Sequence, residues 1–145
     1  MNPKTDAERL VNSAIPLAIK MLKEHGEFYP YGVILTSEGE IVHYGAKGAT
    51  DHPKSSEIIA LLEESFRARV VEHSMKAFVL VFDVLIKPPG KAAKMDAIQV
   101  DIEHRDGYAA SVYHPYTLQN SAPIFEASFA CQKELKIFDS PDQGP

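Results

Sequence analysis

The stretch AFVLVFDVLI, residues 77–86, decides the fold of this 145-residue chain. Every residue in it is apolar except Asp83, and most are β-branched or aromatic, which is the composition of a β-strand. A strand that is apolar on both of its faces is typical of the middle of a sheet. We therefore expect residues 77–86 to form a central strand whose neighbours come from the rest of the chain.

The segment that follows this strand alternates between apolar and polar side chains. Over residues 96–105, one face carries Ile98, Val100 and Ile102, and the other carries Gln99, Asp101 and Glu103. Asp106-Gly107 then predicts a two-residue type I′ hairpin turn. A further strand is expected at residues 108–114, and Pro115 should end it or mark a sheet edge. This turn would place the three polar residues opposite partners on the next strand: Gln99 with His114, Asp101 with Val112, and Glu103 with Ala110.

The first helix is expected at residues 5–25, where apolar residues recur every three to four positions. Thr5 and Glu8 have the spacing of a capping box at its start. Gly26 is a typical C-terminal stop. Pro16 lies inside the helix and should kink or split it, because proline removes one backbone donor.

A hairpin and a second helix separate this first helix from the central strand. Glu38-Gly39 predicts a two-residue turn that would place Leu35 opposite Val42. The second helix should start around Pro53, capped by Asp51 or His52, and end at Glu72 or His73.

The remaining chain is harder to assign. Residues 123–131 are apolar without a clear period, residues 134–138 are expected to form a short last strand, and Cys131 should be a small buried hydrophobe. We expect one domain over residues 1–138 and a flexible tail at residues 139–145. The predicted fold class is α+β, an antiparallel sheet of about five strands with two main helices packed on it, in the order α-β-β-α-β-β-β.

This order of elements resembles the profilin-like and roadblock/longin layout of a helix, a hairpin, a second helix and a three-strand meander. The resemblance covers residues 5–117 and rests on the order of the elements rather than on motif residues. It therefore implies a fold and no function.

Composition narrows the classes of function. The 15 Lys and Arg residues stand against 20 Asp and Glu, a net charge of −5, which argues against nucleic-acid binding through a basic surface. A single cysteine excludes an internal disulfide framework and a cysteine-rich zinc site. The longest apolar run is too short to cross a membrane, so a soluble cytoplasmic protein is expected.

Two groups of residues are candidates for a site. The polar face of the sheet would bring carboxylates and an imidazole together as a ligand or metal site, formed by Asp83, Asp101, Glu103 and His114. The alternative is a solvated face whose charges discourage edge pairing. The second group is a candidate partner surface in the aromatic segment that leads into the first predicted hairpin: Phe28, Tyr29 and Tyr31.

No catalytic sequence motif is found, so we expect a non-enzymatic protein–protein interaction module of the adaptor, homodimer or immunity/inhibitor type. Its partner would be another protein or a second copy, with no cofactor, nucleic acid or membrane involved. The alternative is a small-molecule- or metal-binding domain, either a binding protein or an enzyme, that uses the polar face of the sheet.

Overall fold

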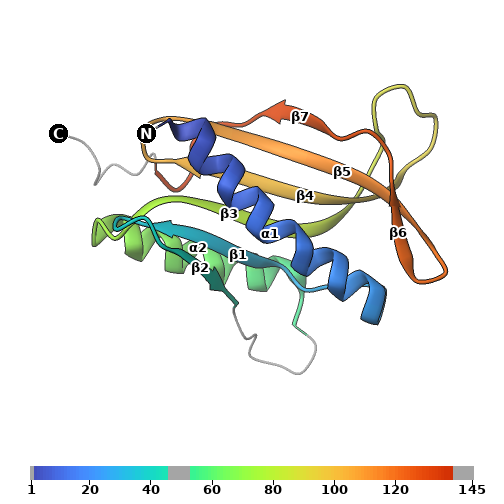
Figure 1. Ribbon diagram of the computed structural model, residues 1–145, viewed down its shortest axis with the longest axis horizontal. Helices are drawn as coiled ribbons and strands as arrows, with labels where there is room; N and C mark the ends of the chain where they lie inside the picture. The colour runs from blue at the N-terminus through green and yellow to red at the C-terminus, as the bar shows by residue number, and fades with distance from the viewer. Residues whose placement is uncertain (1, 46–52, 139–145) are drawn as a thin grey trace.

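The central strand of the sheet is β3 (Met75–Ile86), which contains the stretch at residues 77–86. The computed structural model describes residues 2–45 and 53–138, and there the sheet has seven antiparallel strands in the order β2-β1-β3-β4-β5-β6, with β7 also beside β5 (Figure 1). The other strands are β1 (Tyr31–Thr36), β2 (Ile41–Tyr44), β4 (Met95–His104), β5 (Ala109–Gln119), β6 (Ala122–Phe125) and β7 (Phe129–Gln132). The predicted α+β class and antiparallel sheet are confirmed, with seven strands instead of about five.

Two helices cover opposite faces of this sheet. Residues of α1 (Pro3–His25) pack with Val79 and Val81 on one face, and residues of α2 (Ser55–Val71) pack with Phe78 and Leu80 on the other. Figure 1 shows α1 in front of the strands and α2 behind β1. Since adjacent residues of a strand point to opposite faces, the fully apolar pattern of β3 serves both layers at once.

Helix α1 is continuous and begins earlier than expected. Its N-cap is Asn2, whose side chain accepts a hydrogen bond from the Lys4 backbone N–H, so the predicted Thr5 capping box is wrong. Pro16 lies inside the helix on its exposed side, where the single lost hydrogen bond does not split it. Gly26 ends the helix in the left-handed conformation (φ 75°), as predicted.

Both predicted hairpin turns contain three residues instead of two. At the first turn, the Thr36 N–H donates to the Glu40 C=O and the Gly39 N–H donates to the Thr36 C=O. At the second turn, the His104 N–H donates to the Tyr108 C=O and the Gly107 N–H donates to the His104 C=O. A type I′ turn needs positive φ at both central residues, but in each of these loops only the glycine has it: Gly39 (φ 90°) in the first and Gly107 (φ 102°) in the second. One extra loop residue shifts each register by one, which corrects the predicted pairs: Leu35 faces Ile41, Gln99 faces Tyr113, Asp101 faces Ser111, and Glu103 faces Ala109.

The second half of the chain also differs from the sequence prediction. Strand β5 continues through Pro115. The residues of β5 before Pro115 pair with β7 and those after it pair with β6, so its missing N–H interrupts neither pairing. A true two-residue turn connects β5 to β6, with Asn120 at φ 53° and Ser121 at φ 68°. Residues 134–138 form no strand, so that prediction is wrong.

The remaining boundaries agree with the sequence prediction where they can be compared. Helix α2 has Lys54 at its N-cap position and is followed by Glu72, within a residue of the expected end. The proposed caps Asp51 and His52, and the tail at residues 139–145, lie outside the described residues. Neither α1 nor α2 is long and apolar enough to span a membrane.

Candidate functional site

The four residues predicted to form a polar site are divided between the two faces of the sheet. Asp83 pairs with Ile98, which pairs with His114, and Ile98 packs in the core beneath α1. Asp101 and Glu103 pair with Leu80 and Phe78, which pack in the core beneath α2: they lie on the other face. The four predicted residues therefore do not share one site. The one-residue register shift places His114 on the α1 face, and the pairing of β3 with β4 places Asp83 there too.

Glu103 is a structural anchor rather than an accessible ligand. Its side chain is 1% exposed and accepts the backbone N–H groups of Ile137 at 2.9 Å and Phe138 at 3.1 Å. Lys133 forms an ion pair with its second oxygen. Lys136 adds an ion pair to Glu63 of α2 at 2.9 Å. Together these bonds hold residues 133–138 against the sheet and α2.

Asp83 is bonded within the protein on the α1 face. The Tyr116 hydroxyl donates to its carboxylate at 2.9 Å. Burial raises the pKa of Asp83, and the charges of Asp96 and Glu27 raise it further, while the bond from Tyr116 opposes the shift. Burial likewise raises the pKa of Tyr116, so its hydroxyl remains a donor at neutral pH.

His114 lies on the same face as Asp83. Burial lowers the pKa of His114, and no described residue bonds to its buried Nε2 atom. Burial therefore favours the neutral form of the ring. Across residues 2–45 and 53–138, no cluster of three or more His, Cys, Asp or Glu side chains is placed to hold a metal ion.

His104 and Asp6 form a buried imidazole–carboxylate pair. His104 Nε2 lies 2.9 Å from Asp6 Oδ2, and each residue is 2% exposed. The backbone N–H of Asp106 donates to His104 Nδ1 at 3.0 Å, so the ring proton is on Nε2 and points to Asp6. Both ring nitrogens are thus engaged, and the pair ties the start of α1 to the end of β4.

Asp101 lies in a polar network on the face opposite α1. Ser111 Oγ donates to Asp101 Oδ1 at 2.6 Å, and Gln99 Nε2 donates to the same oxygen at 2.8 Å. No described residue donates to Asp101 Oδ2. The side chain is partly exposed, so this oxygen can accept a hydrogen bond from another molecule.

Two stacked aromatic rings lie next to this network. Tyr113 and Phe129 have ring centroids 5.0 Å apart at an interplanar angle of 17°, and both are partly exposed. Burial raises the pKa of Tyr113, with smaller contributions from Cys131 and Asp101. Cys131 is exposed in β7 rather than buried as predicted.

Neither α1 nor α2 covers this side of β4, β5 and β7. Helix α2 packs on β1 and β3, and Figure 1 shows it away from β4, β5 and β7. We call this area the open face and define it by one buried residue, Ser111, and five partly exposed ones: Phe82, Gln99, Asp101, Tyr113 and Phe129. The sequence places Gln99 and Asp101 on one polar face but does not predict the other four residues of the open face. The expected two-residue turn puts His114 and Val112 beside them, in place of Tyr113 and Ser111.

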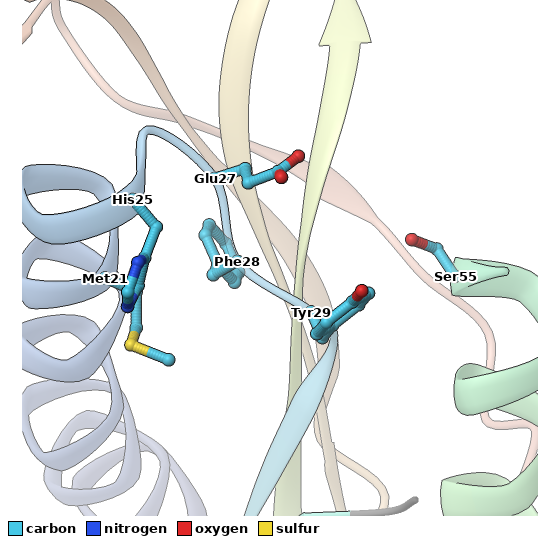
Figure 2. A pocket seen from close by; sticks show the side chains of 6 residues that line it. All are labelled: Met21, His25, Glu27, Phe28, Tyr29 and Ser55. Carbon is cyan, nitrogen blue, oxygen red and sulfur yellow. The ribbon is translucent and has the colours of Figure 1, made fainter. Parts of the chain in front are cut away.

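The predicted aromatic partner surface is mostly core. Phe28 and Tyr31 are 9% and 7% exposed, and the Tyr31 hydroxyl donates to the Ala14 carbonyl in α1. Burial raises the pKa of Tyr31. Tyr29 alone points outward, at 54% exposed, beside a hollow between the end of α1 and the start of α2 (Figure 2).

No family model, no curated protein and no solved structure matches this chain. The likeness to the profilin and roadblock/longin layout stays one of element order. The first seven elements follow that order, and β6 and β7 extend it.

Proposed function

We propose that this domain is a protein–protein interaction module that binds its partner through the open face. The observation that carries the proposal is the uncovered outer part of the sheet, where the Tyr113–Phe129 stack lies beside the Asp101 network. Aromatic side chains at the centre of a surface are the residues that contribute most to protein–protein affinity.

The charge of the open face favours a partner with a basic side chain. Among the charged groups near it, Glu103 is paired with Lys133 and Lys91 is paired with Glu126. Asp101 has no cationic partner among the described residues. An arginine fits best, because its guanidinium can bond Asp101 Oδ2 and stack on the Tyr113 ring.

The alternative of a shared ligand or metal site loses its support. It depended on Asp83, Asp101, Glu103 and His114 lying on one face, and they lie on two. A cytoplasmic location remains our proposal, since the only cysteine is an exposed free thiol, which is typical of reducing compartments.

Photo-cross-linking in cells of the source organism tests the proposal. A benzophenone amino acid is placed either at Tyr113 in the open face or at Leu61, which is 40% exposed on α2. We expect one discrete protein adduct from position 113 and none from position 61. Adducts from position 61 alone, or none from either position, would contradict the proposal.

The captured partner is then purified and its affinity measured against two matched variants. Asp101→Asn keeps the shape and removes the charge, whereas Asp106→Asn makes the same charge change in the hairpin loop at residues 105–107. We expect the first to weaken binding about tenfold or more, with a weaker salt dependence, because a desolvated charge pair is lost. The second should leave affinity unchanged. Equal effects of the two variants would show that binding follows net charge and not the open face.

A further inference from the structure

A hollow of about 380 Å³ lies at one end of the sheet, away from the open face. Its wall comes from three segments: the last turns of α1, the connection to β1, and the first residue of α2 (Figure 2). The described residues that line it are Met21, His25, Glu27, Phe28, Tyr29 and Ser55. This volume falls within the range of small-molecule sites, roughly 300–1,000 Å³.

One part of the wall is apolar and aromatic. Phe28 is held in place by an edge contact with Tyr31, with ring centroids 5.9 Å apart. Met21 supplies a thioether from α1, and Tyr29 supplies a ring on which no described aromatic residue stacks. Such rings offer their faces to an apolar group or to a cation.

The polar part of the wall is acidic. Figure 2 shows the Glu27 carboxylate, the Tyr29 hydroxyl and the Ser55 hydroxyl directed towards the same space. The C-terminal end of α1 adds partial negative charge at His25. The charge of Glu27 also reaches Asp83, whose pKa it helps to raise, and Asp96 contributes to the same local field.

Among the described residues that line the hollow there is no Lys or Arg; the N-terminus of α2 at Ser55 and the exposed Lys54 beside it oppose the negative charge of the wall. Three features coincide in this hollow: the space itself, an aromatic ring that stacks on no described residue, and the carboxylate of Glu27. We propose that this hollow binds a small organic cation, an ammonium or guanidinium group on an apolar body. The charged head lies at Glu27 and the body lies on Phe28 and Tyr29.

The test uses phenethylammonium as the probe and the full chain labelled at its methionine methyl groups. Met21 lines the hollow and reports binding by NMR, and its signal is assigned with Met21→Leu. We expect a saturable shift of the Met21 methyl at millimolar probe. The neutral 2-phenylethanol and the anionic 3-phenylpropionate should bind more weakly.

Two variants separate the charge from the ring. Glu27→Gln should weaken binding about two- to fivefold, the range for a partly exposed ion pair. Tyr29→Ala should weaken it by a similar factor of about two to five through the lost cation–π contact. Both positions are exposed, so the fold should be retained, as a melting curve will show.

Glu24→Gln is the matched control, because Glu24 is exposed on α1 near the hollow but does not line it. It should leave the affinity for phenethylammonium unchanged. Three results would overturn the proposal: no saturable shift at Met21, equal binding of the neutral alcohol, or tighter binding of the anion. The last would show that the N-terminus of α2 dominates the field.

Discussion

Glu103 Oε1 accepts the backbone N–H of Ile137 across 34 positions of sequence, at 2.9 Å. This bond joins β4 to the final described segment and leaves a carboxylate almost wholly removed from water. The carboxylate looked available in the sequence, yet its bonds to Ile137, Phe138 and Lys133 engage both oxygens. Its role is to position residues 133–138, which gives the first prediction.

Replacing Glu103 with alanine should destabilise the protein by about 3–5 kcal/mol, because Lys133 would be left as an unpaired, partly buried charge. Urea unfolding measures the free energy. Amide exchange should also accelerate at Ile137 and Phe138 before the rest of the sheet opens. Glu134→Ala, at an exposed neighbouring position, should change stability by no more than about 0.5 kcal/mol. Unchanged exchange at Ile137 in Glu103→Ala would refute the anchoring role.

The Asp6–His104 pair should show measurable coupling. Asp6→Ala removes the acceptor of a buried Nε2–H group, at an expected cost of about 2–3 kcal/mol. A double-mutant cycle with His104→Ala should give a coupling energy of about 1–3 kcal/mol. Glu8→Ala, on the exposed side of α1, is the control. Strict additivity of the two substitutions would mean that the pair does not tie α1 to β4.

His114 should make the fold sensitive to mild acid. Burial lowers the pKa of His114 below the ordinary value of 6.5, so the unfolded chain binds the proton more readily than the folded one. The contribution of the neutral ring is full above pH 6.5 and is lost as the pH falls through the folded pKa.

The comparison is between the unchanged protein and His114→Phe, by urea unfolding at pH 7.5 and pH values down to 5. The stability of the variant relative to the unchanged protein should rise as the pH falls. Leu118→Phe, at an exposed position of β5 that carries no titratable group, should not alter the slope. Parallel curves for His114→Phe and the unchanged protein would show that His114 does not titrate differently in the two states.

The turn between β5 and β6 should accept a stabilising substitution. Ser121 has φ 68°, a conformation that costs a residue with a Cβ atom and that glycine adopts freely. Ser121→Gly creates an Asn-Gly pair, the preferred type I′ sequence, and should stabilise the protein by up to about 1 kcal/mol. A raised melting temperature confirms it. A lowered one would mean that the entropy glycine adds to the unfolded chain outweighs the relieved strain.

The sequence by itself determined the elements that carry strong local patterns. The apolar stretch at residues 77–86 predicted a central strand, the period of α1 predicted a helix ending at Gly26, and the order α-β-β-α-β-β-β holds through β5. Hydrophobic burial makes these patterns readable, because a helix or strand must present its apolar side chains to the core wherever it lies.

Only the tertiary structure decided which polar residues share a face and which aromatic side chains are exposed. Asp106-Gly107 is compatible with loops of two or three residues, and that single residue sends His114 to one face and Tyr113 to the other. Residues 133–138 lack a local pattern because their conformation depends on Glu103, far away in the sequence. Likewise, Tyr29 is exposed and Tyr31 is buried because α1 crosses β1, a packing relation that no local period encodes.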